Sequence, residues 1–365
     1  MRLEGIDLLR GIAVVAVIFY HFFAILDPVN NSIFPYVHSF GLFGVSLFFI
    51  ISGFLIYRSV DYSVSQQGVK RGLLQYANHR LFRILPAYYF NFFIVLLIAT
   101  FIIESDYFYS LGFLKTILSH LTFTSYFIYK DSGLGINGAY WTLSIEMLWY
   151  IIAPFLYIFI KKDKYLVLLF LLSFMYLIGI DISLFDSIFN LDVNASNYTL
   201  LLYYLSFQLP GQFIYFLTGI FIYKFLNNPL ILSATSRYVL SFLLITVFIF
   251  VTSHYNLHTK FALNNLFILF IVSILFILLY RSKPMKMAFI EWIGKISYSL
   301  YLWHMVLLYI MKKTAILNFL SIGMTSALFV IMLIMISACS YYFIEEGGFR
   351  LRKKIESKFI IRKGI

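Results

Sequence analysis

The sequence has almost no cysteine: its 365 residues include one, Cys339. An intramolecular disulfide needs two cysteines, and zinc or iron–sulfur sites built on several thiolates need more, so both are excluded within this chain. Cys339 lies in an apolar run, and we interpret it as a packing residue.

Charged residues are also scarce. They make up 12% of the chain, whereas 62% is hydrophobic and 21% is aromatic. Soluble domains carry about 25% charged residues, so this composition excludes an ordinary soluble domain and indicates a polytopic membrane protein. We therefore predict an all-α fold, without an appended soluble domain and without a convincing internal repeat.

Ten apolar runs are long enough to cross a bilayer, with ends defined to within about two to four residues. They predict about ten transmembrane helices. The runs lie at about 8–26, 40–57, 87–104, 142–160, 165–182, 207–223, 238–254, 262–280, 297–311 and 321–343.

The net charge of +12 would fit nucleic acid or anionic lipid as a partner. Where the basic residues lie along the chain shows which interpretation of this charge holds. If the N-terminus is inside, 23 of the 28 Lys and Arg residues fall in inner segments. This asymmetry predicts that both termini are cytoplasmic. The charge is then a topology signal, membrane lipid surrounds the protein, and we expect no nucleic acid. The five outer residues are Lys115, Lys130, Lys260, Lys312 and Lys313.

The first apolar run, IDLLRGIAVVAVIFYHFFAIL, contains Arg10 and His21. Eleven residues are close to three helical turns, so both lie on one face, about 16 Å apart along the axis. Ionisable residues inside a membrane helix indicate a functional site, and histidine suits a general base near neutral pH. Asp7 can pair with Arg10. The alternative is that Arg10 anchors the helix at the inner surface while His21 makes an interhelical contact.

In the fourth run, WTLSIEMLWY carries Glu146 at about the depth that His21 has in the first run. A carboxylate that binds an imidazole fixes its tautomer and stabilises its protonated form, so we predict that Glu146 orients His21. The alternative is a buried acid with a structural role.

A polar inner loop, about Arg58 to Leu85, contains HRLFR, in which Arg80 and Arg83 are three residues apart. On a helix both project to the same side and can grip phosphates, although a juxtamembrane anchor for anionic lipid is the reading that charge alone favours. His304, with Tyr301 nearby, is predicted near mid-membrane. It either lines a cavity together with His21 and Glu146 or is a packed, hydrogen-bonded histidine. Since no short-spaced ligand pair occurs, we expect no metal.

Six motifs occur in order along almost the whole chain. Together they resemble the acyltransferase 3 family of integral membrane acyltransferases, which modify bacterial surface polysaccharides and similar extracytoplasmic acceptors. The motifs are IDLLRGIAVVAVIFYHF, FGVSLFFIISGFLI, HRLFRILPAYY, WTLSIEMLWYIIAP, IGKISYSLYLWH and YYFIEEGGFRLRK.

This resemblance implies a ten-helix core that moves an acyl group, usually acetyl, from cytoplasmic acyl-CoA, in that case acetyl-CoA, to a hydroxyl on the far side. Arg10 and His21 match the family's essential pair, and Arg80 and Arg83 match its Arg-x-x-Arg motif for the coenzyme A phosphates. The tryptophan–serine–glutamate signature is matched by Trp141, Ser144 and Glu146.

From this resemblance we predict an acyltransferase domain over 1–346 and a basic cytoplasmic tail over 347–365, in a bacterial plasma membrane. The catalytic residues are His21, Glu146 and Arg10, and Arg10 also borders the donor. The acceptor is an extracytoplasmic glycan or glycolipid, a surface polysaccharide or lipid-linked glycan, for which the candidate contacts are Trp141, Ser144, Tyr301 and His304.

Four points stay open. Glu345-Glu346-Gly347-Gly348 replaces the glutamate and proline that end the last span in many relatives. A proton-coupled exporter of an acylated or anionic solute, with His21, Glu146 and His304 as a proton relay, is the alternative function. The acyl chain and the oligomeric state are not determined by the sequence.

Overall fold

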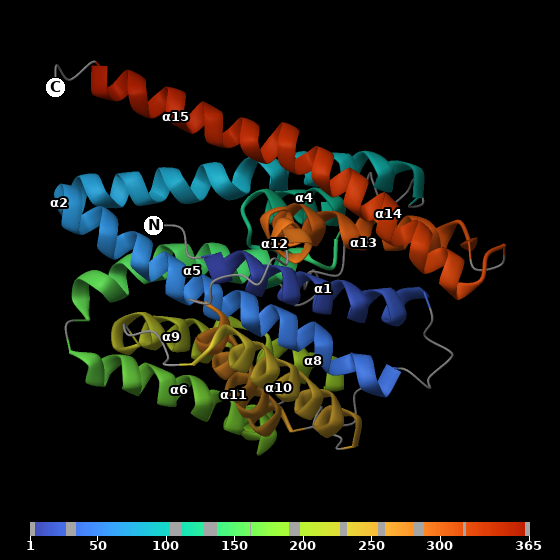
Figure 1. Ribbon diagram of the computed structural model, residues 1–365, viewed down its shortest axis with the longest axis horizontal. Coiled ribbons are helices and arrows are strands. Elements are labelled where there is room, and N and C mark those ends of the chain that lie inside the picture. The colour runs from blue at the N-terminus through green and yellow to red at the C-terminus, as the bar shows by residue number, and fades with distance from the viewer. Residues whose placement is uncertain are drawn as a thin grey trace. The chain divides into compact units, whose positions relative to one another are not determined.

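Helices dominate the computed structural model of the chain (Figure 1). The residues that the structure describes contain α-helices, a 3-10 turn at Ser125–Phe127 and a π-helical turn at Tyr341–Glu345, and no β-strand. The prediction of an all-α fold is therefore confirmed for this part of the chain. The described residues are 4–26, 34–102, 111–127, 137–160, 162–189, 198–226, 232–254, 260–280, 288–316 and 319–361.

The chain divides into two compact units, each made of two stretches of sequence. The first unit combines Met1–Arg58 with Ile151–Lys295, and the second combines Ser59–Tyr150 with Ile296–Ile365. The chain passes between the units within two helices, α2 (Phe34–Ile102) and α5 (Tyr140–Phe159), and again after α12.

In the first unit, α6, α9, α10 and α11 pack beside one another, and α1 packs against α12 (Figure 1). Small residues allow the close approach of α1 and α12: a methyl group on Gly11 would lie 2.5 Å from the Ile290 carbonyl oxygen, and one on Gly294 would overlap the Asp7 carbonyl oxygen. The helices of this unit are α1 (Glu4–Leu26), the start of α2, the end of α5, α6 (Asp163–Asp181), α7 (Leu184–Phe189), α8 (Tyr198–Ser206), α9 (Leu209–Phe225), α10 (Ala234–His254), α11 (Phe261–Leu279) and α12 (Ala288–Lys295).

In the second unit, α13 packs against α14, and α14 continues through the π-helical turn into α15. α15 runs alongside the second half of α2 (Figure 1), where Gly348 approaches Pro86. The other helices of this unit are α4 (Leu111–Leu121), the first half of α5, α13 (Ser297–Lys313), α14 (Ile322–Ser340) and α15 (Glu346–Ile361).

The segment from Arg58 to Leu85, predicted as a polar inner loop, is helical. α2 extends over 69 residues and includes two of the predicted spans, with one kink at Gly68. Gly68 has φ 74° and ψ 170°, a conformation that a residue with a Cβ rarely adopts, so glycine at this position makes the kink.

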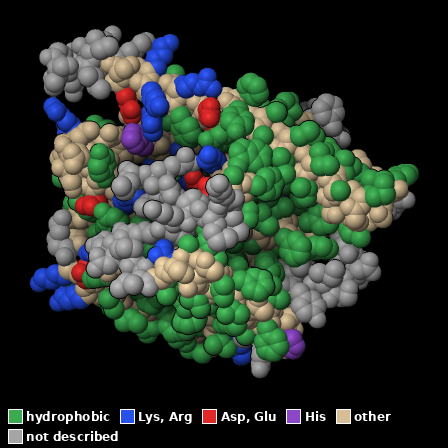
Figure 2. All heavy atoms as spheres, viewed as in Figure 1, with side chains coloured by type: hydrophobic (Ala, Val, Ile, Leu, Met, Phe, Trp, Pro, Cys, Tyr) green, Lys and Arg blue, Asp and Glu red, His purple; other side chains and the backbone are tan. Residues whose placement is uncertain are grey.

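Eight helical segments of the described chain are long and apolar enough to cross a membrane. Two of the ten predicted spans are merged in α2, and α13, with 17 residues, is too short to count among the eight. The number ten and the side on which the termini lie stay predictions. Apolar side chains cover much of the surface seen in Figure 2, as a lipid-facing surface requires. The eight segments are Gly5–Leu26, Ser39–Ile98, Tyr140–Phe159, Asp163–Asp181, Leu201–Phe225, Ala234–His254, Phe261–Leu279 and Ile322–Ser357.

Candidate functional site

Helix α1 carries the first pair of candidate residues. It is unbroken from Glu4 to Leu26, so Arg10 and His21 lie on one helical face, as predicted. The Arg10 Nη1 atom lies 3.8 Å from Asp7 Oδ1, which confirms the predicted pairing of these two side chains. Asp7 partly neutralises the guanidinium and holds it at its end of the helix.

His21 forms a hydrogen bond that selects its tautomer. Its Nδ1 lies 3.0 Å from the carbonyl oxygen of Val17, one turn earlier in α1. A carbonyl oxygen only accepts, so Nδ1 carries the hydrogen and the lone pair is on Nε2. A neutral imidazole in this tautomer has the form that a general base acting through Nε2 needs, and the catalytic role of His21 stays a prediction.

In the second unit, a chain of contacts joins Arg80 to Glu146. The Tyr150 hydroxyl donates to Glu146 Oε1 over 3.0 Å, and the Arg80 guanidinium carbon lies 5.8 Å from the ring centroids of both Tyr150 and Tyr76. The Tyr76 hydroxyl in turn donates to the Tyr150 carbonyl oxygen over 2.9 Å. Two cation–π contacts therefore fix the arginine beside the tyrosine that binds the acid.

The two tyrosines were missed by the sequence analysis. Tyr76 is four residues before Arg80, and Tyr150 is four residues after Glu146, so their helical spacing marks each as a neighbour on its own helix. This spacing could have identified both tyrosines from the sequence. The contact of Tyr150 with Arg80 connects α5 to α2, and periodicity within one helix carries no information on it.

Arg83 lies one turn beyond Arg80 on the same helix, as the motif predicts. Tyr150 and Tyr341 are both within electrostatic range of its guanidinium. The second unit therefore brings both arginines and Glu146 to one region around Tyr150.

The four candidate acceptor contacts each hydrogen-bond to or pack against neighbouring residues. The Ser144 hydroxyl donates to the Tyr140 carbonyl oxygen over 3.4 Å, and the Trp141 ring lies 5.4 Å from that of Tyr126. The Tyr301 hydroxyl lies 2.7 Å from Thr142 Oγ1, which connects α13 to α5. The last of the four, His304, is fully buried.

His304 makes the same kind of contact as His21. Its Nδ1 lies 2.7 Å from the Tyr301 carbonyl oxygen, which places the hydrogen on Nδ1. The side chain is completely buried, which fits the packed-histidine reading as well as a cavity lining.

The sequence also did not predict a buried amide network just before α5. Asn137 donates through Nδ2 to the Leu302 carbonyl oxygen over 3.1 Å and to Asn91 Oδ1 over 3.4 Å, and its own Oδ1 accepts from the Ala139 amide. The Tyr140 hydroxyl also donates to Asn91 Oδ1, over 2.6 Å. This network joins α2, α5 and α13 on the side of Glu146 where the acceptor candidates lie.

The model of the acyltransferase 3 family, described as an acyltransferase domain, matches residues 3–345. The chain belongs to the acyltransferase 3 family. It is also 25% identical over 304 residues to the "Putative acetyltransferase ORF330" of the Acidianus two-tailed virus, covering 82% of this chain and 81% of the relative. No solved structure matches the chain.

Within this acyltransferase 3 protein, the candidate residues are divided between the two units. Arg10 and His21 belong to the first, and the others belong to the second. The pairing of His21 with Glu146 therefore stays a prediction. Among the described residues, no three His, Cys, Asp or Glu side chains are grouped as metal ligands. The second unit's candidates are Arg80, Arg83, Trp141, Ser144, Glu146, Tyr301 and His304.

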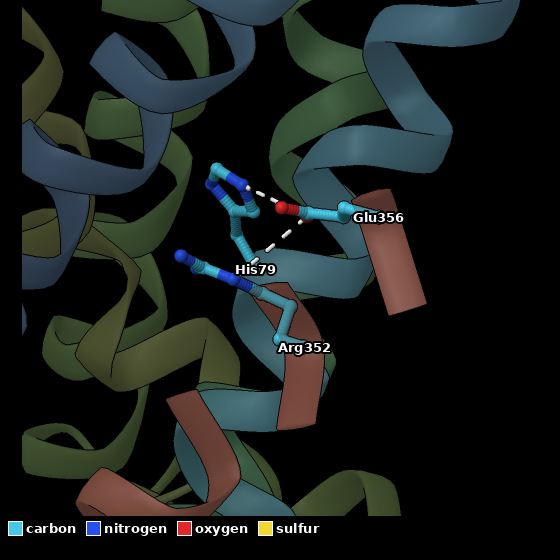
Figure 3. A network of polar contacts seen from close by, with 3 residues as sticks. All are labelled: His79, Arg352 and Glu356. Carbon is cyan, nitrogen blue, oxygen red and sulfur yellow. Dashed lines mark ion pairs between the residues drawn. The ribbon is translucent and has the colours of Figure 1, made fainter. Parts of the chain in front are cut away.

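A further polar network in the second unit joins His79, Arg352 and Glu356 (Figure 3). His79 Nε2 is 3.3 Å from Glu356 Oε1, which is also 3.8 Å from Arg352 Nε. Glu356 and Arg352 lie on α15, so this network connects the C-terminal helix to the arginine-bearing part of α2.

Proposed function

We propose that the protein is an O-acyltransferase that moves an acetyl group from cytoplasmic acetyl-CoA to a hydroxyl of an extracytoplasmic glycan, a surface polysaccharide or a lipid-linked glycan, across a bacterial plasma membrane. Membership of the acyltransferase 3 family supports acyl transfer. The observation that carries the proposal is the chain Arg80–Tyr150–Glu146, since it joins a cation suited to the donor to an acid suited to the chemistry.

Arg80 and Arg83 are the residues that we assign to the phosphates of the donor. The Arg80 guanidinium lies over the rings of Tyr76 and Tyr150, and arginine binds phosphate oxygens through several N–H groups. Arg10, at the other end of α1 from His21, is assigned to the thioester arm.

His21 is the general base in this proposal. Its Nε2 removes the proton of the acceptor hydroxyl while the hydroxyl oxygen attacks the carbonyl carbon of the thioester. The carbon–sulfur bond then breaks, the proton passes to the coenzyme A sulfur, and the products are the ester and free coenzyme A. Glu146 stabilises the protonated imidazole, and Trp141, Ser144, Tyr301 and His304 contact the acceptor.

The test uses full-length protein in lipid nanodiscs with acetyl-CoA labelled on the acetyl group. Wild-type protein should release coenzyme A and label the glycan only when both substrates are present. His21→Ala should reduce labelling at least about a hundredfold, since general bases contribute about 10²–10⁴-fold. The exposed His254 provides the matched control, and His254→Ala should retain full activity.

Two results would contradict the proposal. Retained labelling by a folded His21→Ala protein would remove His21 from the catalytic role. Movement of an acylated solute across the bilayer without release of coenzyme A would support the exporter instead.

A further inference from the structure

Two hydrogen bonds mark where α5 packs on the second half of α2. At one of them, the Tyr76 hydroxyl donates to the Tyr150 carbonyl oxygen. Ten residues earlier in α5, the Tyr140 hydroxyl donates to Asn91 Oδ1 over 2.6 Å. Ten residues of helix span about 15 Å, so the two contacts are about 15 Å apart along α5. Glu146 lies between them on the same helix.

The side chain of Asn137 determines which way the amide of Asn91 faces. Asn137 Oδ1 accepts from the Ala139 amide, and Asn137 Nδ2 donates to the Leu302 carbonyl oxygen. Since a backbone N–H only donates and a backbone carbonyl only accepts, both ends of the Asn137 amide are assigned. Asn137 Nδ2 has a second hydrogen, which it donates to Asn91 Oδ1 over 3.4 Å.

Asn91 is therefore oriented with its oxygen toward two donors. If its oxygen and nitrogen were exchanged, the Asn91 amino group would face the amino group of Asn137, so Oδ1 accepts from both Asn137 and Tyr140. The side chain is fully buried, and within the described part of the chain its Nδ2 has no hydrogen-bond acceptor. A buried donor without an acceptor destabilises the folded protein, so this nitrogen needs an oxygen from elsewhere.

Asn91 belongs to the same group of contacts as two residues that we assign to the acceptor. Ser144 donates to the carbonyl oxygen of Tyr140, whose hydroxyl binds Asn91. Thr142, on the same helix, lies 2.7 Å from the Tyr301 hydroxyl. These contacts surround the start of α5, whereas the Arg80 side chain that we assign to the donor lies at the other contact, about 15 Å along the helix.

We propose that Asn91 is a binding residue for the acyl acceptor, and that its Nδ2 donates to a neutral oxygen of the acceptor glycan. A primary amide is uncharged and has two hydrogens on one nitrogen, which suits the hydroxyl, ring and carbonyl oxygens of a sugar. Phosphate is better bound by arginine. The inference rests on the proposed function, because it adds a residue to the acceptor site. Since Asn91 is buried, the acceptor displaces side chains around the start of α5 when it binds.

A purely structural role is the competing explanation. In that case Asn91 only joins α2 to α5 through its oxygen, and a buried water accepts from Nδ2. Both explanations need the contacts of Oδ1. Only the proposal gives the Nδ2 hydrogens a role in the reaction, so variants that separate the two ends of this amide test it.

The test measures steady-state acetyl transfer by full-length protein in phosphatidylcholine nanodiscs. The donor is acetyl-CoA labelled on the acetyl group, and the acceptor probe is surface glycan extracted from cells that lack this protein. Asn91→Leu has a side chain of similar size without the N–H groups. It should raise the KM for the glycan about tenfold and leave the KM for acetyl-CoA unchanged. Tyr140→Phe removes the hydroxyl that binds Oδ1 and leaves Nδ2 in place, so it should change the glycan KM much less.

The structural explanation predicts a different result. Asn91→Leu and Tyr140→Phe both break the hydrogen bond between these two side chains, so the two variants should then change the glycan KM equally. Equal changes would overturn the inference. Asn91→Asp is the second variant if Asn91→Leu does not fold, as unfolding temperatures show. Its ionised carboxylate keeps an oxygen for both donors but lacks the Nδ2 hydrogens, and it should also raise the glycan KM.

Three further results have distinct meanings. If wild-type protein transfers no acetyl group to the extracted glycan, the proposed function fails and the inference fails with it. If wild-type protein transfers acetyl and folded Asn91→Leu has the same glycan KM, only the inference fails. Equal rises of the KM for the glycan and the KM for acetyl-CoA would also overturn the inference, because Asn91 would then act on the whole site and not on the acceptor.

Discussion

At the scale of single residues, Tyr150 has two separable roles. Its hydroxyl donates to Glu146, and the Arg80 guanidinium lies over its ring. The hydroxyl acts on the acid that we assign to chemistry, whereas the ring acts on the cation that we assign to donor binding. Variants that remove one role at a time can therefore divide the reaction into its two parts.

Tyr150→Phe should lower the turnover number about tenfold while leaving coenzyme A affinity unchanged. The substitution removes one hydrogen bond to a charged group, worth about 1.5–3 kcal/mol, and keeps the ring beside Arg80. Tyr150→Leu also removes the cation–π contact and should weaken coenzyme A binding as well. Steady-state turnover and calorimetry check the two effects, and equal turnover for Tyr150→Phe and wild type would separate Tyr150 from the chemistry.

Asn137 has a role in stability. It is fully buried and makes three hydrogen bonds, to α2, to α13 and to the turn that precedes α5. Asn137→Ala leaves several buried polar groups without this partner, so the free energy of unfolding should fall by about 2–4 kcal/mol. Ser357→Ala, at an exposed hydroxyl that bonds within its own helix, should be near neutral. Unfolding midpoints in detergent measure both, and a neutral Asn137→Ala would show that water replaces the amide.

At the residue scale, the sequence predicted contacts within one helix and missed contacts between helices. The Asp7–Arg10 pair and the shared face of Arg10 and His21 follow from helical spacing. The Tyr150–Arg80 contact depends on how α5 packs on α2. Polar residues in apolar runs indicate that a buried partner exists, but they do not identify it.

At the scale of helices, the glycines of the last segment have different neighbours. The replacement of the usual proline left the end of the last span open, and the structure shows the helix continuing through the π-helical turn into α15. Within that turn, Glu345 accepts from Ser299 over 2.5 Å, which ties the turn to α13. Gly348 touches α2, whereas Gly347 has open space beside it.

Gly348→Ala and Gly347→Ala should therefore have opposite effects. A methyl group at position 348 meets Pro86 and Phe82 at distances that force the helices apart, and the free energy of unfolding should fall by about 1–3 kcal/mol. At position 347 the methyl group meets nothing within 4 Å, and alanine should stabilise the helix by about 0.5–1 kcal/mol. Thermal unfolding of the two variants compares them directly, and similar shifts would contradict the close packing of α15 on α2.

The sequence predicted the apolar helices well and the connection inside α2 poorly. Apolar runs identify spans because a bilayer requires about 20 apolar residues, and their ends agree with the structure within a few residues for α1, α6 and α11. The polar stretch between two spans carries no such requirement, so it was read as a loop. In the structure it is helical with a kink at Gly68, and it contains no proline before Pro86 that would break the helix.

At the scale of the whole molecule, the orientation in the membrane determines which compartment each substrate comes from. The proposal needs Arg80 and Arg83 to be accessible from the cytoplasm. The basic residues predict this, because 23 of 28 fall in segments on one side when the N-terminus is inside. The two units and the eight apolar helices are the same for either direction of insertion. A labelling experiment therefore has to establish the direction.

Lys115 and Lys354 give that experiment two exposed positions in the second unit, on α4 and on α15. In a Cys339→Ser background, Lys115→Cys should react with a membrane-impermeant maleimide in intact cells, since Lys115 is predicted outside. Lys354→Cys should react only after the cells are opened, because the basic segment that follows α14 is held inside. A denatured sample, in which both cysteines react, controls for chemical reactivity. The reverse pattern would place Arg80 and Arg83 outside, where cytoplasmic acetyl-CoA cannot reach them, and the donor would have to be an extracytoplasmic molecule.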